Sequence, residues 1–153
     1  MQIREAMTPD VRTVSPGSTL REAAKLMVTI DAGVLPVSDG DRLIGMVTDR
    51  DIAVRGVALG KGPDTAVGEV MSQEVKYCFE DEEIEDVCEN LADLQVRRLP
   101  VLNRDKRLVG IVSLADIVTL AGSESAGAAL EGITRPSGAH NQTNDARAHD
   151  ANT

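Results

Sequence analysis

The sequence predicts a mixed α/β (α+β) fold in which two pseudo-symmetric β-α-β-β-α units pack through their sheets. The chain is a tandem repeat of one sequence unit. In each copy, one segment has apolar residues at helical spacing and other segments have short apolar runs typical of strands. Neither copy has enough apolar surface to be stable alone. A single one-residue gap over about 55 positions suffices to align the copies. The aligned pairs are Ile3–Met7 with Val67–Met71, Leu35–Val37 with Leu99–Val101, Arg42–Thr48 with Arg107–Ser113, and Asp51–Ile52 with Asp116–Ile117.

Each unit is expected to begin with a short extended piece and then a helix. The extended pieces are Thr13–Val14 and Tyr77–Cys78. Thr19-x-x-Glu22 has the pattern of a capping box, which opens a helix. Apolar residues then recur at helical spacing, which predicts one buried face. They are Leu20, Ala23, Ala24, Met27 and Ile30 in the first unit, and Ile84, Val87, Cys88, Leu91 and Leu94 in the second.

Two short apolar strands joined by a polar turn follow each helix. We expect strands at 34–37 and 43–47 in the first unit, and at 99–101 and 108–112 in the second. The second strand of each pair is nearly all apolar, which predicts burial on both faces. A final helix should begin near Thr48 and near Ser113.

The composition places boundaries between these units. We expect the first repeat over residues 1–58, a Gly- and Pro-punctuated linker over 59–64, and the second repeat over 65–121. From 122 to 153 the chain is rich in Ala, Ser, Gly, Asn and Thr, and Leu130 and Ile133 are its only large apolar residues. This composition predicts a flexible tail.

Charge and aromatic content exclude several classes of function. The 153 residues carry a formal net charge of −9 and include one Tyr, one Phe and no Trp. Nucleic-acid binding needs a basic footprint, and single strands need aromatic stacking platforms, so we expect no nucleic-acid partner. Both histidines, His140 and His149, lie near the C-terminus. The rest of the chain therefore has no imidazole for general-base catalysis or metal ligation, which predicts neither an enzyme nor a metal site.

The cysteines and the hydropathy of the chain indicate the cellular compartment in which the protein is expected. Cys78 and Cys88 lack metal-ligand spacing, and we interpret them as small buried apolar residues, with a regulatory disulfide as the minor alternative. The N-terminus has no apolar signal region, and no run of 18 apolar residues occurs. We therefore expect a cytoplasmic protein with reduced thiols and no membrane association.

The strongest local motif is a strand followed by Thr48-x-x-Asp51 or Ser113-x-x-Asp116 at the start of a helix. A helix N-terminus attracts anions such as phosphate, and the hydroxyl could add a hydrogen bond. The carboxylate three residues later is an acceptor suited to ribose hydroxyls. The same pattern is also a variant capping box that needs no ligand, and both roles can coexist.

A second candidate is the pair Arg97–Arg98, directly before the strand at 99–101. An arginine there could clamp phosphate through two hydrogen bonds. The alternative is an ion pair with the acidic segment from Glu80 to Asp93, which holds eight carboxylates and no basic residue. That segment is interpreted as a solvated face. The matching residues of repeat one are Gly33–Val34, so two anion sites would be unequal.

With these motifs the sequence closely resembles a tandem CBS-domain protein (a Bateman module) of the small stand-alone bacterial type. The resemblance covers roughly residues 1–121, and the sequence is similar to hypoxia- or stress-associated members of the family. It rests on Met7–Thr8, Gly33–Val37 and Gly45–Ile52 in the first repeat, and on Val96–Val101 and Gly110–Ile117 in the second.

The resemblance implies regulatory binding of AMP, ADP or ATP between the repeats, with S-adenosylmethionine or NAD less expected and no cofactor required. By motif, Asp51 and Asp116 would bind ribose, Thr48 and Ser113 would meet phosphate, and Arg98 beside Arg97 would contact phosphate. It further implies a homodimer formed through exposed helices. Backbone groups would frame the adenine, and the residues at or beside which they lie are Thr13, Val34, Leu35, Pro36, Tyr77, Cys78, Leu99 and Pro100.

Two functional hypotheses follow. The first is a non-catalytic ligand-sensing module that binds an adenine nucleotide. The second is a dimerising interaction or scaffold domain with empty clefts that docks an unknown protein partner, which the acidic segment and the polar tail would support.

Overall fold

The computed structural model describes residues 1–94 and 97–121. The tail expected over 122–153, with both histidines, lies outside the described residues. The first repeat contains α1 (Leu20–Ile30), β1 (Val34–Asp39), β2 (Arg42–Thr48) and a short α2 (Asp49–Asp51), which continues as a π-helical turn over Ile52–Gly56 and a 3-10 turn over Val57–Leu59. The second repeat contains β3 (Cys78–Phe79), α3 (Ile84–Leu94), β4 (Arg98–Leu102), β5 (Leu108–Ser113) and α4 (Leu114–Ala121). Among the described residues no helix is long and apolar enough to cross a membrane.

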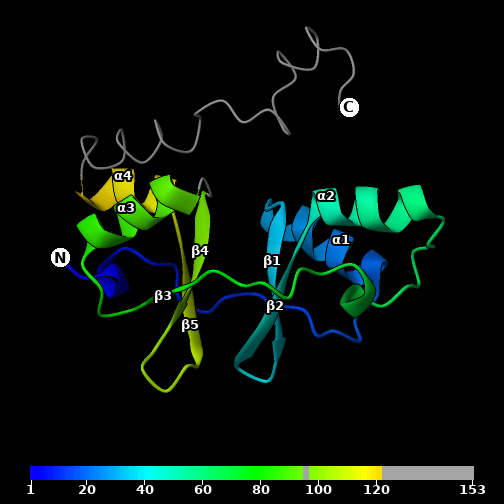
Figure 1. Cartoon of the computed structure of the whole chain (residues 1–153), viewed down its shortest axis with the longest axis horizontal. Helices are drawn as coiled ribbons and strands as arrows, with labels where there is room; N and C mark the ends of the chain where they lie inside the picture. Colours follow the sequence, from blue (N-terminus) through cyan, green and yellow to red (C-terminus); the bar gives the residue numbers. More distant parts are fainter. Residues whose placement is uncertain (95–96, 122–153) are drawn as a thin grey trace, which may run out of the picture.

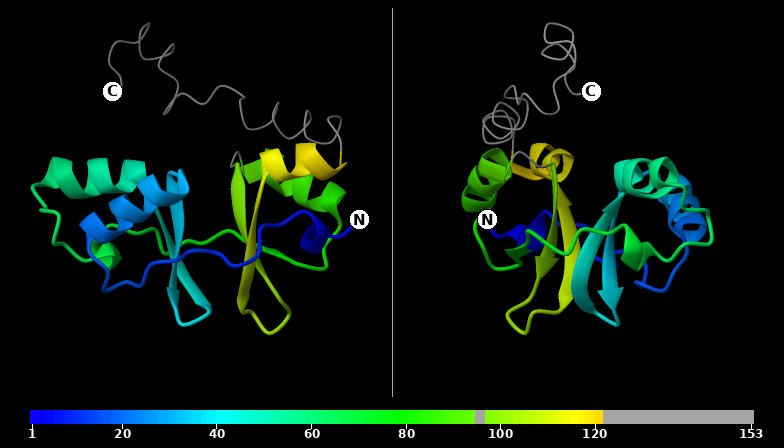
Figure 2. Two further views of the ribbon diagram at one scale, coloured as in Figure 1. Left: turned by 180° about the vertical axis from the view of Figure 1, so that it is seen from behind. Right: turned by 45° about the vertical axis from the view of Figure 1, so that its right-hand side comes forward.

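The two hairpins stand side by side at the centre of the molecule, and the four helices lie at one end of them (Figures 1 and 2). β1 pairs antiparallel with β2, and β4 with β5, in equivalent registers such as Val34 opposite Thr48 and Arg98 opposite Ser113. β3 adds parallel to β4. The expected β-α-β-β-α order is therefore confirmed, except that the first strand of repeat one is reduced to a single bridge from Val14 to Val37.

One expectation about the strands is wrong. Leu43 and Ile44 in β2, like Leu108 and Val109 in β5, are only half-buried, whereas β1 and β4 carry the continuous buried runs. For β2 the reason is tertiary, because its turn-side part faces a cavity between the two hairpins instead of a second packed layer.

Each repeat has its own hydrophobic core, and each core includes residues from the N-terminal segment of the other repeat. Ile3 is fully buried among Ile84, Leu91 and Val112 of the second repeat. Val67 and Val70 complete the core of the first repeat. We name the two segments, residues 1–8 and 65–72, the crossing segments.

Backbone hydrogen bonds hold both crossing segments in place. The amide of Thr8 donates to the carbonyl of Ile111 and receives the Ile111 amide in return, at 2.8 and 3.0 Å. Met46 and Ser72 make the equivalent pair at 3.0 and 2.8 Å. The strands can approach this closely because glycine faces each crossing segment. A Cβ on Gly45 would lie 2.8 Å from the Ser72 carbonyl oxygen, and one on Gly110 would lie 3.0 Å from that of Thr8.

The reciprocal packing predicts that truncation of Ile3 destabilises the second repeat. Ile3→Ala should lower the free energy of unfolding by about 2–5 kcal/mol, since it opens a cavity in a closed core. Amide hydrogen exchange should accelerate in α3, β4 and β5 before it does in β1 and β2. Arg4→Ala, which truncates the exposed neighbouring side chain, is the control and should change stability by less than about 0.5 kcal/mol. Faster exchange confined to β1 and β2 would contradict this prediction.

Candidate functional site

Both hydroxyl–carboxylate motifs form capping boxes where a strand passes into a helix. The amide of Asp51 donates to Thr48 Oγ1, and the amide of Thr48 donates to Asp51 Oδ2, each at 3.0 Å. Ser113 and Asp116 repeat this arrangement at 3.1 and 2.9 Å. The interpretation that needs no ligand is thus confirmed as local structure. Because each cap uses one carboxylate oxygen and the acceptor side of the hydroxyl, the second oxygen and the hydroxyl proton are left for other contacts.

Between the repeats, at the helix end of the hairpins, lies a cavity of about 500 Å³ that we name the helix-side cavity. Thr48 and Val34 contribute from repeat one, and Arg97 and Arg98 from repeat two. Its volume suits a small-molecule ligand. The full lining is Gly33, Val34, Met46, Thr48, Ser72, Glu74, Lys76, Arg97, Arg98, Leu99 and Pro100.

The same two arginines also line a neighbouring cavity of about 310 Å³ beside the N-terminus of α4. Ser113, Leu114, Ala115 and Val118 complete it. Both arginine side chains are exposed. Two carboxylates of the acidic segment pair elsewhere, since Glu83 binds the N-terminal amine at 2.9 Å and Asp81 binds Arg104 at 2.7 Å. Arg97 and Arg98 line both cavities, one together with Thr48 and the other together with Ser113.

At the equivalent place repeat one has Gly33 and Val34 and no cation, and Asp49 lies too close to Gly33 to leave room for a side chain there. Asp49 lies directly beside Gly33, because the Asp49 amide donates a hydrogen bond to the Gly33 carbonyl at 2.9 Å. A Cβ on Gly33 would lie only 2.8 Å from Asp49 Oδ2. The repeats are therefore chemically unequal, with an acid over glycine in one and arginine in the other.

Several predicted residues lie away from the helix-side cavity. Leu35 and Cys78 are fully buried in the two cores and Pro36 is buried beside Leu35 in β1, so each offers a ligand little more than its backbone. The hydroxyl of Ser38 donates to Thr13 Oγ1 at 3.0 Å, which ties Thr13 to β1. Asp51 Oδ1 faces Arg55 at 3.8 Å. Tyr77 lines the cavity between the hairpins.

Lining residues that were not predicted from the sequence include Ser72, Glu74 and Lys76. They belong to a stretch that begins at Ser72, the last residue of the second crossing segment, and that lacks helical or strand-like apolar periodicity. Only the close approach of that stretch to both hairpins makes them lining residues. Glu74 adds a negative charge and Lys76 a positive one.

The two cysteines are buried free thiols, and no disulfide joins them. Desolvation, with a smaller contribution from the charge of Glu82, raises the pKa of Cys78 to about 12. The pKa of Cys88 is raised as well, first by desolvation and then by Glu85. Within the described part of the chain, no group of three or more His, Cys, Asp or Glu side chains could hold a metal ion.

The family model "CBS domain" matches the chain twice, over residues 3–56 and 67–123. CBS domain-containing protein YhcV of Bacillus subtilis is 44% identical over 133 residues, which cover 86% of this chain and 94% of that protein. Hypoxic response protein 1 of Mycobacterium tuberculosis is 42% identical over 116 residues, which cover 74% of this chain and 80% of that protein.

Solved structures share the fold. Hypoxic Response Protein I with two coordinated zinc ions has a TM-score of 0.72 and 39% identity, with 78% of this chain and 98% of that chain covered. CBSX2 in complex with AMP has a TM-score of 0.68 and 27% identity, with 78% and 95% covered. The CBS domain pair of MJ0100 in complex with 5-methylthioadenosine and S-adenosyl-L-methionine has a TM-score of 0.70 and 28% identity, with 80% and 100% covered.

The buried thiols predict low reactivity and a defined pH dependence. Since the folded-state pKa of Cys78 is about 12 against an ordinary 9.0, burial of the neutral thiol stabilises the fold fully below pH 9. That contribution should be lost as pH rises from about 9 toward 12. At pH 8 a thiol reagent should label the native protein far more slowly than the chain unfolded in guanidinium. Gln73→Cys, at an exposed position, should add one fast-reacting thiol, whereas rapid labelling of the unmodified native protein would contradict the prediction.

Proposed function

Because this chain belongs to the CBS-domain family and carries two CBS domains in tandem, we propose that it is a non-catalytic regulatory module that binds an adenine nucleotide between its repeats. The observation that carries the proposal is the convergence of Arg97 and Arg98 on two cavities that adjoin capped helix starts. AMP, ADP and ATP each combine a phosphate, which suits the arginines, with a ribose, which suits the aspartates of the caps.

The phosphate end of the ligand would lie against the arginines. Two guanidinium groups offer paired hydrogen bonds to phosphate oxygens. The hydroxyl of Ser113 can donate while it still accepts the Asp116 amide. The N-terminus of the eight-residue helix α4 adds its positive dipole end beside the same arginines.

The ribose would be recognised by the aspartates. Oδ2 of Asp51 and of Asp116 is engaged in the cap, so the second carboxylate oxygen is the acceptor for a ribose hydroxyl. Capping then serves recognition, because it holds each carboxylate in a single orientation before the ligand arrives. The proposed adenine contacts at Val34, Leu99 and Pro100 are apolar, in keeping with the scarcity of aromatic residues.

Two solved relatives hold adenosine compounds, AMP in CBSX2 and S-adenosyl-L-methionine with 5-methylthioadenosine in the MJ0100 pair. For this chain the charges favour the phosphorylated ligands. Arg97, Arg98 and Lys76 outnumber the single acid Glu74 in the helix-side cavity. S-adenosyl-L-methionine carries a positive sulfonium group, which these cations would repel.

Ligand binding would act through the spacing of the repeats. The helix-side cavity takes its walls from both repeats and from the stretch at 72–76. A bound nucleotide therefore stabilises one arrangement of the repeats by its differential affinity for that arrangement.

The partner of this module includes a second copy of itself. Val28, Val57 and Leu59 are large apolar residues with exposed fractions of 82, 68 and 70%. Val28 and Val57 border a mostly apolar groove of about 390 Å³ that also includes Ala24 and Ile52. Exposed apolar groups in such a cluster are typical of an interface, and we assign this face to a homodimer.

The nucleotide proposal predicts a ligand-dependent thermal shift. AMP, ADP or ATP at about 100 times its Kd should stabilise the folded state by about 2.7 kcal/mol, which raises the Tm by several degrees. Asp116→Ala should remove that shift but also lower the ligand-free Tm, because it removes a cap. Arg98→Gln is the sharper variant, since it should remove the shift while the ligand-free Tm stays unchanged.

Arg12→Gln removes an exposed positive charge from another part of the fold and should keep the full shift. If no adenine nucleotide moves the Tm at millimolar concentration, the proposal fails and the interaction domain with empty clefts is favoured. Native mass spectrometry of the purified protein gives an independent reading, because it reports any bound ligand and the oligomeric state together.

The homodimer predicts a response to charge on the helix face. Val28→Asp should convert the dimer to a monomer in sedimentation equilibrium, because it buries a carboxylate in the apolar contact. Thr29→Asp places the same charge on the next residue of α1, which is exposed but does not line the groove, and should leave the dimer in place. A dimer unaffected by Val28→Asp would place the interface on another face.

A further inference from the structure

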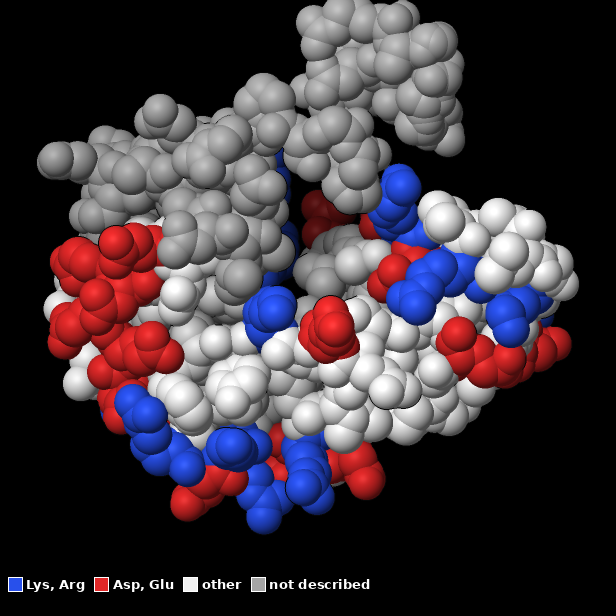
Figure 3. Space-filling model, in the orientation of Figure 1, with Lys and Arg blue, Asp and Glu red and all other residues white. Residues whose placement is uncertain are grey.

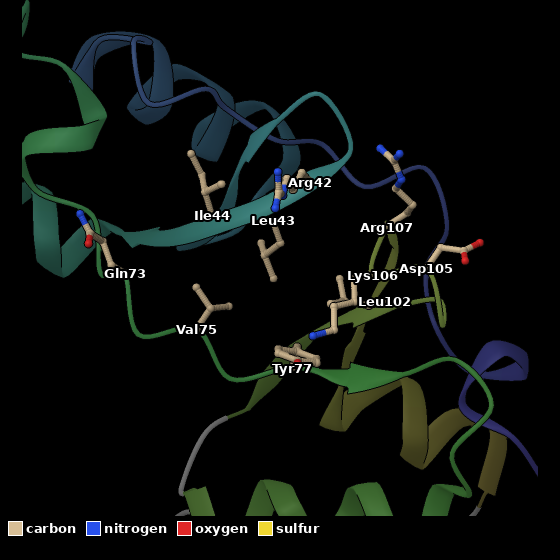
Figure 4. A pocket seen from close by; sticks show the side chains of 10 residues that line it. All are labelled: Arg42, Leu43, Ile44, Gln73, Val75, Tyr77, Leu102, Asp105, Lys106 and Arg107. Atoms are coloured by element: carbon tan, nitrogen blue, oxygen red, sulfur yellow. The ribbon is translucent and has the colours of Figure 1, made fainter.

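We propose that the cavity between the two hairpins is a second ligand site, specific for a small organic anion that carries an apolar or aromatic body. This hairpin-side cavity measures about 560 Å³ and is formed by both repeats (Figure 4). The site is separate from the nucleotide clefts and does not depend on the function proposed above. It is lined by Arg42, Leu43, Ile44, Gln73, Val75, Tyr77, Leu102, Asp105, Lys106 and Arg107.

The stretch 72–77 forms the wall between the two sites. Its residues alternate: Ser72, Glu74 and Lys76 line the helix-side cavity, whereas Gln73, Val75 and Tyr77 line the hairpin-side cavity. This is the period of an extended chain, in which successive side chains point to opposite sides. One short stretch therefore presents two different chemical surfaces to two cavities.

The hairpin-side cavity concentrates positive charge. Arg42, Lys106 and Arg107 face a single acid, Asp105, in its lining. Arg107 is paired with Asp41 of the other hairpin. Arg42 and Lys106 form no ion pair with any carboxylate that the structure describes, which leaves two cations for a ligand. The space-filling view shows Lys and Arg side chains gathered at this hairpin end of the molecule, with some Asp and Glu side chains among them (Figure 3).

The turn that carries Lys106 is held in place before any ligand binds. Asn103 Oδ1 accepts the amides of Asp105 and Arg107, each at 3.0 Å. The Lys106 amide donates to the Asn103 carbonyl at 2.9 Å, and Lys106 adopts a positive φ of 62°. In Figure 4 the Lys106 side chain extends from this turn toward Tyr77, whereas Asp105 points away from the cavity. The Lys106 ammonium group is therefore available to a ligand in the cavity, whereas the Asp105 carboxylate is not.

Apolar groups form the rest of the surface. Leu43, Val75 and Tyr77 point toward one another across the cavity (Figure 4). The Tyr77 ring packs edge-on against Phe79, with 5.5 Å between ring centroids, and Arg104 lies 4.1 Å above the Phe79 ring. Asp81 in turn accepts three hydrogen bonds from Arg104, at 2.7, 2.9 and 3.1 Å. Tyr77, which lines the cavity, is thereby held in place by Phe79 behind it, and Phe79 itself is not part of the lining.

These features select the ligand class. Two cations above an apolar floor with one aromatic ring favour a carboxylate or phosphate attached to a ring or a short aliphatic chain. A bare inorganic anion would leave the floor unused, and a neutral ring would leave the cations unpaired. Ribose recognition by Asp51 or Asp116 is not expected here, because both belong to the helix starts at the opposite end of the hairpins.

The test is a titration of the full-length, ¹⁵N-labelled protein with 1-naphthoate, followed by amide shifts. Saturable shifts are expected at residues 73–77 and 102–107. Naphthalene-1-carboxamide, which has the same ring without the charge, and inorganic phosphate, which has charge without a ring, should each bind at least roughly tenfold more weakly. Lys106→Gln and Arg42→Gln should each weaken naphthoate binding several-fold, and their spectra report whether the fold is intact.

Arg12→Gln is the charge-matched control and should bind naphthoate as the unmodified protein does. Arg98→Gln should also bind it normally, which separates this site from the nucleotide clefts whether or not a nucleotide binds there. The proposal is overturned if the shifts fall at 33–34, 97–100 and 113–116 instead, or if the carboxamide binds as tightly as the acid. It is equally overturned if Lys106→Gln and Arg42→Gln both leave naphthoate binding unchanged.

Discussion

The reciprocal exchange of the crossing segments is the interaction on which the rest of the structure depends. Each repeat lends a short N-terminal stretch to the other, so that Ile3 seals one core and Val67 the other. The hairpins accept these stretches only because Gly45 and Gly110 present no side chain at the points of contact. Since each core contains residues of the other repeat, the stability of each repeat depends on the segment that the other supplies.

The exchange also creates the cavities. To move from one repeat to the other, the chain must pass across both hairpins, and the stretch 72–77 does so in extended conformation. The space on either side of it becomes a cavity with walls from both repeats. Sites in such a position report on the relative placement of the repeats, which is the property that a regulatory module needs.

Pseudo-symmetry in the backbone coexists with asymmetry in the chemistry. The caps at Thr48 and Ser113 are geometrically equivalent, and both leave one aspartate oxygen unused by the cap. At the adjacent position, however, repeat one places Asp49 over Gly33, whereas repeat two supplies Arg97 and Arg98. Arg97 and Arg98 therefore supply positive charge to the cavities at both helix starts, and repeat one adds no arginine of its own at the equivalent place. Equal occupancy of two clefts by phosphate is not expected for this reason.

The sequence by itself determined the duplicated unit, its helices and hairpins, and the capping motifs, because these depend on local periodicity and on hydrogen bonds within three residues. It also singled out Arg97 and Arg98 as cations without counterparts in repeat one. The tertiary structure alone decided that Ile3 belongs to the core of the other repeat, and that Ser72, Glu74 and Lys76 face one cavity while Val75 and Tyr77 face another. The physical reason is that contacts between distant segments depend on how the repeats close around each other, and no local pattern encodes that closure.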